Sequence, residues 1–203
     1  MARILKKYPQ IELKFSDSKK KIDFKNVFGR KSPLHIEIGS GKGTFILNQA
    51  KAFPNHDFLG IEWASRYYRY AVDRLGRWNI KNAKMLHTEA ASFISKNIYP
   101  CSVDCFHIYF PDPWPKKRFF NDKNLAALIN SLNSKGRIKF VTDHSDYFDQ
   151  VKEVIKNARK SVEQTDFVPA AGSKEGEYVG TNYERKYIIQ HRPIYIIALK
   201  KID

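Results

Sequence analysis

Residues 110–118 read FPDPWPKKR and combine side chains with several kinds of chemistry. Their three prolines forbid a helix and remove backbone donors, which predicts a rigid loop. This loop presents a carboxylate at Asp112, an indole at Trp114 and then three cations. Such a set of groups suits a flat, polar, anionic substrate, and a nucleotide fits that description. The alternative interpretation is a proline-rich surface turn followed by a solvated basic run.

A second motif, EIGSGKG at residues 37–43, lies between a predicted strand and a predicted helix. Glycines at such a junction permit unusual φ values and let a ligand touch the backbone, so Gly39 and Gly41 are candidate cofactor contacts. The Gly-x-Gly-x-Gly spacing differs from the dinucleotide pattern Gly-x-Gly-x-x-Gly. By itself the motif indicates a nucleotide only weakly, and an ordinary glycine-rich turn is the alternative.

Acidic residues follow or interrupt three consecutive predicted strands. Glu37 stands inside an apolar strand, where a carboxylate needs a partner such as the ammonium of an amino-acid ligand. Glu62 ends the second strand, where an acid can accept hydrogen bonds from ribose hydroxyls. Glu89, followed by Ala90, ends the third strand within reach of an adenine edge. Glu62 and Glu89 could each be an ordinary exposed carboxylate, but together the three acids suit S-adenosylmethionine, because a phosphate ligand would prefer cations and bare N–H groups.

The elements that must position these residues alternate between strand and helix. Hydrophobic patterning predicts strands at residues 34–38, 58–61, 83–86, 105–109, 137–142 and 193–199, and helices at residues 44–52, 65–78, 90–97, 124–132 and 146–160. This alternation predicts an α/β fold with a parallel sheet and helices on both faces. Ser65 is the expected N-cap of the second helix. The polar, glycine-rich residues 172–180 predict a mobile loop. We expect one domain at residues 34–203, preceded by a basic, irregular segment at residues 1–33.

Composition narrows the class of partner. The 203 residues include 36 Lys plus Arg against 21 Asp plus Glu, a net charge of +15, and 42% are hydrophobic. This excess favours a folded protein that binds a polyanion, with nucleic acid as the first candidate. No stretch approaches the roughly 20 apolar residues that span a bilayer, and the N-terminus lacks the apolar region of a signal peptide. We therefore expect a cytoplasmic protein that does not bind a membrane.

The sequence predicts no metal site. Cys101 and Cys105 do not have the usual Cys-x-x-Cys spacing, and no second Cys/His pair completes a zinc site. The six histidines show no ligand spacing. Cys105 falls in an apolar strand, where we expect it to be buried and inert, and so few cysteines suit a reducing cytoplasm.

With these motifs in view, the chain resembles the bacterial tRNA (guanine-N7-)-methyltransferases over about Leu34 to Leu199. The glycine loop at residues 37–43, the Gly60-Ile61-Glu62 triplet and the full proline loop match the family pattern. Thr142-Asp143 and the TNYERK motif at residues 181–186 match it as well. The proline loop and the last motif are family-specific, whereas many methyltransferases share the glycine loop.

The resemblance implies a class I methyltransferase fold, which is Rossmann-like, with a seven-stranded, mostly parallel sheet and one antiparallel strand. It implies S-adenosylmethionine as methyl donor and N7 of a guanosine in the variable loop of tRNA as acceptor. Residues that match the family's cofactor contacts are Glu37, Glu62, Glu89 and Asp112, and Asp112 is also implied to be catalytic. Residues that match its tRNA contacts are Lys116, Asp143, Thr181, Tyr183 and Glu184. The sequence does not distinguish a monomer from a homodimer.

Two departures from the family pattern bear on the substrate. Glu89-Ala90 replaces the family's usual Asp-Ala, and residues 119–123, FFNDK, replace its usual His and basic cluster. The second change weakens or redirects the expected contact with tRNA. Three other readings stay open: a methyltransferase for another base, such as adenine N6, a non-catalytic RNA-binding protein on the same fold, and an NAD-dependent oxidoreductase. The first usually has an Asp/Asn-Pro-Pro-aromatic loop, and the glycine spacing disfavours the last.

Overall fold

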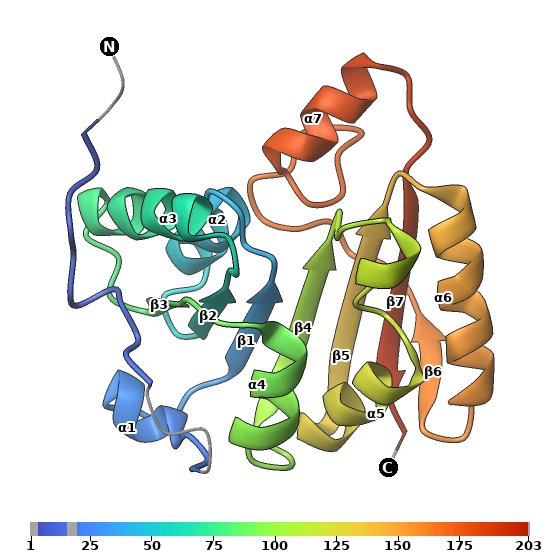
Figure 1. Ribbon diagram of the computed structural model, residues 1–203, viewed down its shortest axis with the longest axis horizontal. Coiled ribbons are helices and arrows are strands. Elements are labelled where there is room, and N and C mark those ends of the chain that lie inside the picture. The colour runs from blue at the N-terminus through green and yellow to red at the C-terminus, as the bar shows by residue number, and fades with distance from the viewer. Residues whose placement is uncertain (1–3, 16–19, 203) are drawn as a thin grey trace.

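The computed structural model describes residues 4–15 and 20–202 and contains a seven-stranded sheet in the order β3-β2-β1-β4-β5-β7-β6 (Figure 1). The strands are β1 (Leu34–Ile38), β2 (Asp57–Ile61), β3 (Ala83–Leu86), β4 (Val103–Tyr109), β5 (Leu132–Thr142), β6 (Val162–Thr165) and β7 (Tyr195–Lys201). The helices are α1 (Phe24–Phe28), α2 (Thr44–Ala52), α3 (Ser65–Arg77), α4 (Ala90–Asn97), the 3₁₀ turn η1 (Pro115–Lys117), α5 (Asp122–Ser131), α6 (Ser145–Asn157) and α7 (Asn182–Ile189).

Strand β7 is the antiparallel strand that the resemblance implied. It pairs antiparallel with both β5 and β6, while β1 pairs parallel with β2 and β4. The β2–β3 and β4–β5 pairs are also parallel. The predicted fold class is therefore confirmed.

Side chains alternate between the two faces of the sheet and build separate cores there. On one face, Phe106 and Phe140 pack with residues of α4, α5 and α6, including Phe93, Leu128 and Tyr147. On the other face, Phe58 and Met85 pack with α2 and α3. Parallel strands covered on both faces are buried along nearly their whole length, as β2 and β4 are, and most of their residues are apolar.

The described residues of the N-terminal segment attach to the edges of this domain. The N–H of Leu13 donates to the Met85 carbonyl and the N–H of Met85 to the Ile11 carbonyl, both at 2.8 Å. Further on, the N–H of Ile22 donates to the Asn97 carbonyl at 2.8 Å. Ile11 and Ile22 are buried. The segment thus shares the core, and a domain boundary at residue 34 stays a prediction.

Local boundaries differ from the expected ones where side-chain bonds decide them. Ser65 was expected to be the N-cap of α3, but Ala64 holds that position and Ser65 is the first helical residue. The N–H of Ala64 donates to Glu62 Oε1 at 2.7 Å, so an acid two residues earlier orders this helix start. Strand β5 begins at Leu132 instead of Arg137, and α6 ends at Asn157 instead of Lys160.

The sheet gathers its loops at one edge. Because β1, β2, β4 and β5 run parallel, their carboxyl ends lie at the same edge, beyond whose arrowheads α7 lies in Figure 1. Strands β2 and β3 follow on one side of β1, and β4 lies on its other side. The order of strands therefore reverses between β1 and β4, which is the topological switch point. Ligands of open α/β sheets bind at such a point. Over residues 4–15 and 20–202, no helix is both long and apolar enough to cross a bilayer.

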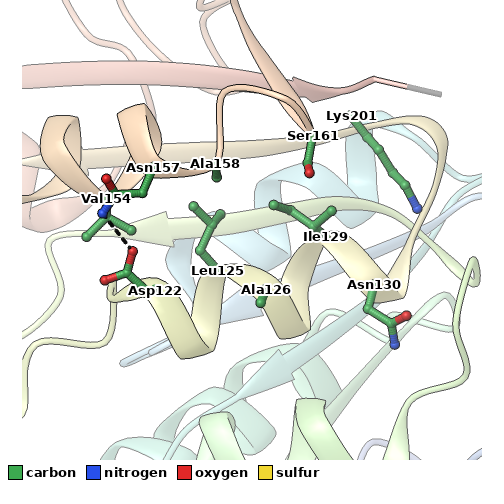
Figure 2. Close-up of a pocket in the computed structure, with 10 residues that line it drawn as sticks. All are labelled: Asp122, Leu125, Ala126, Ile129, Asn130, Val154, Asn157, Ala158, Ser161 and Lys201. Carbon is green, nitrogen blue, oxygen red and sulfur yellow. Dashed lines mark hydrogen bonds between the residues drawn. The ribbon is translucent and has the colours of Figure 1, made fainter.

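A separate hollow of about 540 Å³ lies between α5, the end of α6 and Lys201 (Figure 2). Its lining is half apolar and half polar, with Leu125 and Val154 on the helices and a hydrogen bond of 3.1 Å from Asn157 to Asp122 at one end. It contains none of the residues that the sequence singled out for chemistry.

Candidate active site

A cavity of about 690 Å³ opens at the carboxyl edge of the sheet, across the switch point. Eight of the predicted site residues line it: Glu37, Gly39, Gly41, Glu62, Asp112, Asp143, Thr181 and Tyr183. The predicted residues Glu89, Ala90, Lys116 and Glu184 are not among its lining residues. The structure therefore brings most of the predicted cofactor contacts together with most of the predicted tRNA contacts. These residues are up to 146 positions apart in the sequence, from Glu37 to Tyr183.

The glycine loop exposes its backbone to the cavity. Gly39 and Gly41 have φ angles of 76° and 54°, which disfavour any residue with a side chain. No atom of the described chain, apart from the chain neighbours of each glycine, lies within 4 Å of the place where a Cβ would stand on either residue. A Cβ there would project into open space, so the loop is shaped for close approach by a ligand.

Glu62 ties the end of β2 to this loop. Its Oε2 accepts from the Gly41 N–H at 2.7 Å, and its Oε1 accepts from the Ala64 N–H at the same distance. The carboxylate is therefore held in a fixed position, and each oxygen keeps a lone pair that can accept from a hydroxyl group. This bracing of the glycine loop was not anticipated from the sequence.

Glu37 is the unusual acid of the site. It is buried on β1, and its Oε2 has no hydrogen-bond partner within residues 4–15 and 20–202. Burial, followed by smaller effects that include repulsion from Glu62, raises the pKa of Glu37 from 4.5 to about 8. A buried carboxyl with an unused oxygen on the wall of a cavity is suited to a cationic ligand group.

Glu89 takes a different position from the one expected. It is the N-cap of α4, where its carboxylate accepts from the Ala91 and Ser92 N–H groups, both at 2.7 Å. An acid at a helix N-terminus is favourable because it satisfies free N–H groups there. The predicted contact of Glu89 and Ala90 with adenine stays a prediction.

The proline loop follows β4 after a strained residue, Phe110, and a hydrogen bond to Asp112 stabilises its turn. Phe110 has a φ of 49°, a conformation that aromatic residues rarely adopt. Asp112 Oδ1 accepts from the Trp114 N–H at 3.1 Å, and Oδ2 lies 3.8 Å from Lys117 Nζ. The Asp112 side chain is 43% exposed, and Trp114 is 69% exposed. The loop thus holds a carboxylate and an indole at the mouth of the cavity.

The three cations after the loop have different roles. Lys116 and Lys117 are exposed, but the Arg118 side chain is only 9% exposed. Arg118 donates from Nε to the Pro113 carbonyl and from Nη1 to Gln150 on α6, each at 2.8 Å. It also pairs with Asp146 and lies over the ring of Tyr147 at 4.9 Å. Arg118 therefore fastens the proline loop to α6.

Glu184 bonds to the backbone of the preceding segment, and its predicted contact with tRNA stays a prediction. It is fully buried at the start of α7, and its two oxygens accept from the N–H groups of Tyr178, Val179 and Gly180. These bonds, with a salt bridge of 2.8 Å from Arg185 to Glu177, attach the segment that was expected to be a mobile loop to α7. Glu184 positions the neighbouring Thr181 and Tyr183 instead of facing the cavity.

Asp143 reaches the cavity as half of an ion pair. Arg192 donates from Nη1 to Asp143 Oδ2 at 2.7 Å and lies over the Tyr187 ring at 4.8 Å. The Asp143 side chain is nearly buried, whereas Arg192 is half-exposed. A substrate that contacts Asp143 would meet this pair and not a free carboxylate.

Comparison with known proteins places this chain in a family. Residues 31–197 match the Methyltransf_4 methyltransferase family model. A tRNA (guanine-N(7)-)-methyltransferase of Rhodopirellula baltica is 33% identical over 202 residues, covering 89% of this chain and 70% of the relative. The chain belongs to the tRNA (guanine-N(7)-)-methyltransferase family. A protein of the same name from Bacillus licheniformis is also 33% identical, with 84% of this chain and 81% of the relative covered.

Solved structures show the same fold at low sequence identity. A 30S ribosomal A1408 methyltransferase from an uncultured bacterium aligns with a TM-score of 0.62 at 18% identity, covering 93% of this chain and 96% of the other. The SMU.1697c methyltransferase of Streptococcus mutans, in complex with SAH, aligns with a TM-score of 0.55 at 13% identity, covering 85% and 90%. These similarities establish the fold of this family member.

Aromatic side chains complete the cavity and were missed in the sequence. Tyr67 comes from α3, Phe45 from α2, Tyr109 from β4 and Tyr187 from α7. The rings of Tyr187 and Phe110 meet edge to face at 5.4 Å between centroids. Only the spacing of Tyr183 and Tyr187, which puts both on one helix face, could have indicated part of this wall.

Proposed function

We propose that this protein transfers a methyl group from S-adenosylmethionine to N7 of a guanosine in tRNA. The observation that supports this best is the single cavity at the switch point. The glycine loop, Glu37 and Glu62 form one wall, and the proline loop and α7 form the other. A cofactor wall and a substrate wall therefore share one space. The family name of the relatives supplies the base and the acceptor atom.

The residues present fit S-adenosylmethionine. The unused buried oxygen of Glu37 suits its ammonium group, Glu62 suits its ribose hydroxyls, and the open backbone at Gly39 and Gly41 permits close approach. When bound, S-adenosylmethionine supplies an electrophilic methyl group on a sulfonium. The acids at Glu37 and Glu62 also favour a ligand without phosphates.

Guanine N7 has a free lone pair at neutral pH, so the protein needs no general base for this reaction. Its task is alignment, which accounts for large rate effects when reacting groups are held in position. Asp112 is in place to accept hydrogen bonds from the N1–H and amino group of guanine, since its loop is rigid before substrate arrives. The exposed rings of Trp114 and Tyr183 offer stacking surfaces, as aromatic side chains do in RNA recognition.

The net charge of +15 and the exposed Lys116 suit the phosphates of tRNA. We place the target in the variable loop and the reaction in the cytoplasm, following the resemblance. Lys116 lies outside the cavity, where it is free to contact backbone phosphates beyond the target nucleotide.

The deciding experiment is methyl transfer from labelled S-adenosylmethionine to bulk tRNA, followed by nucleoside analysis. We expect label in 7-methylguanosine, with chain scission after borohydride and aniline treatment. Label in N6-methyladenosine would support the other-base alternative instead. Binding of tRNA with no transfer to any nucleoside would indicate a non-catalytic RNA-binding protein.

A further inference from the structure

A cluster of nitrogen and sulfur donors lies in the sheet beneath the candidate active site. His35 on β1 pairs in register with Cys105 on β4, and His107 follows two positions later on the same face of β4. Ligand atoms of these three side chains all lie within 4.8 Å of one another. His35 Nδ1 and His107 Nε2 are 3.0 Å apart. The proposed methyl transfer uses none of the three.

The second ring nitrogen of each histidine is also held in place. His56 Nδ1 lies 3.2 Å from His35 Nε2, and the hydroxyl of Tyr109 lies 2.7 Å from His107 Nδ1. Histidines that bind metals almost always have their other ring nitrogen bonded in this way, because the bond fixes the tautomer and the ring orientation. Both rings are therefore oriented by partners that leave their facing nitrogens for a shared ligand.

We infer that His35, Cys105 and His107 bind one transition-metal ion of the zinc class through two nitrogens and one sulfur. Imidazole nitrogen and thiolate sulfur are the preferred ligands of such ions, and a water molecule can take the fourth position. Zn–N bonds of about 2.0–2.1 Å in tetrahedral geometry place two nitrogens ~3.3–3.4 Å apart. The imidazole pair would have to open by only a few tenths of an ångström.

The charge state of the cluster suits metal binding. The two imidazole rings bond to each other, to His56 and to the Tyr109 hydroxyl, and none of these partners is a carboxylate that would hold a ring proton. The Cys105 thiol loses its proton when it coordinates, which offsets one metal charge. Lys139, which pairs with His107 in register, opposes a cation here. The Lys139 ammonium is bonded elsewhere, because it donates to the Val168 carbonyl at 3.0 Å.

The cluster lies where a bound ion would hold two strands of the sheet together. It joins β1 to β4 across the switch point, two residues before Glu37 along β1. His35 and His56 are half-buried, whereas Cys105 and His107 are buried, so an ion would enter from the His56 side. A bound ion would fasten the two strands whose ends form the floor of the cavity.

The test is titration of chelator-stripped protein with Co²⁺ as a spectroscopic probe. We expect one equivalent to bind with a near-ultraviolet thiolate-to-cobalt absorption band, which Zn²⁺ then displaces. Cys105→Ala should abolish the band, and His107→Gln should weaken binding at least tenfold. The matched controls Cys101→Ala and His191→Gln change an exposed thiol and an exposed imidazole, so both should keep the parent's band and affinity. His56→Phe should weaken binding about 10- to 100-fold, as expected for an outer partner of a ligating histidine.

Circular dichroism of the metal-free variants checks that they fold. If Cys105→Ala does not fold, X-ray absorption of the zinc-loaded parent decides the question, with two nitrogens and one sulfur expected around the metal. The proposal fails if Co²⁺ produces no thiolate band in the parent or if Cys105→Ala keeps it. It also fails if the absorption spectrum shows no sulfur ligand, and the cluster is then a hydrogen-bonded part of the core. None of these readouts depends on methyl transfer, so this proposal and the proposed function are tested separately.

Discussion

The two acids that matter most in the cavity are held in opposite environments. Glu37 is buried with an unused oxygen, and its pKa is raised to about 8 by burial. Asp112 is half-exposed and accepts a hydrogen bond from the backbone of its own loop. These environments suit the roles that we propose, contact with a buried cationic group of the cofactor for Glu37 and contact with a base that arrives from solvent for Asp112.

Glu37 makes stability depend on pH in a defined window. Below about pH 4.5 the carboxyl is neutral in both the folded and the unfolded state, so its burial has no ionic cost. Between pH 4.5 and about 8 the unfolded chain ionises Glu37 while the folded protein retains the proton, so stability falls as pH rises. The fall is at most about 1.4 kcal/mol per pH unit. Glu37→Gln should remove this component, and urea unfolding of both proteins at pH 5, 6.5 and 8 measures it. Parallel profiles for parent and variant would show that Glu37 is ionised in the folded state.

Asp112→Asn should slow methyl transfer without unfolding the protein. The variant keeps the shape of the side chain but can turn a donor amide toward the guanine N1–H. We expect turnover to fall about 100-fold, which corresponds to about 2.7 kcal/mol of transition-state stabilisation. Single-turnover rates on tRNA provide the measurement, with tRNA affinity as the control because phosphate contacts are untouched. A variant that methylates at the parent rate would assign Asp112 to loop structure alone.

Residue types and spacing predicted which side chains meet, but not how each is bonded. Gly39, Gly41 and Glu62 were predicted because glycines and a strand-end acid are local signals. That Glu62 also holds Gly41 could not be predicted, since the bond joins residues 21 positions apart. In the sequence, Arg118 looks like its two lysine neighbours. Its burial results from packing against α6, which no local signal in the sequence indicates.

At the scale of elements, two attachments hold the proline loop and α7, which form one wall of the cavity. Arg118 connects the proline loop to α6, and Glu184 connects residues 178–180 to the start of α7. Each attachment uses one charged side chain with several bonds at once. Loss of either should affect the position of an element instead of a single contact.

Arg118→Lys tests the first attachment. Lysine keeps the charge but lacks the planar fork that reaches Pro113, Gln150 and Asp146 together. We expect turnover to fall about tenfold, or about 1.4 kcal/mol, with little change in tRNA affinity because Arg118 is buried. Lys160→Arg, an equally conservative change at an exposed lysine outside the proline loop, is the control. A loss of tRNA affinity with unchanged turnover would instead make Arg118 a phosphate contact.

Glu184→Gln tests the second attachment. Its amide would direct a donor at backbone N–H groups that now bond to a carboxylate. We expect the free energy of unfolding to fall by about 1–3 kcal/mol and residues 172–180 to become sensitive to proteolysis. Denaturant unfolding and limited proteolysis measure these effects. If activity falls while stability and proteolysis match the parent, Glu184 contacts substrate as the family resemblance implies.

At the scale of the whole molecule, the net charge of +15 should dominate the affinity for tRNA that we propose. Affinity should fall steeply as salt rises, because phosphate contacts release counterions. Lys116→Ala should reduce the slope of log affinity against log salt by roughly 1. Lys160→Ala, which changes an exposed lysine three residues beyond the end of α6, should leave the slope unchanged. A parent protein whose affinity is insensitive to salt would contradict a tRNA substrate.

The alternation of strands and helices was predictable because hydrophobic residues repeat at the spacing of a strand or a helix within each long element. Strand β6 was missed, since only Val162 of its four residues is buried and they pair only with β7, 33 to 39 positions later. Helices α1 and α7 were missed because they are short, and the TNYERK motif was recognised without its helix. The N-terminal residues were expected to be irregular, and nothing local shows that Ile11 and Ile22 enter the core.

The position of β7 has a consequence for synthesis of the chain. This strand lies between β5 and β6, so β6 has no neighbour in the sheet until residues 195–201 have emerged from the ribosome. Residues 178–187, which contribute to one wall of the cavity, are separated from β7 by residues 188–194, and Val179 packs in one cluster with Val141 of β5 and Ile196 of β7. The nascent protein therefore assembles its catalytic pocket last, and ribosome-bound chains that stop before β7 should expose the β5 edge to chaperones.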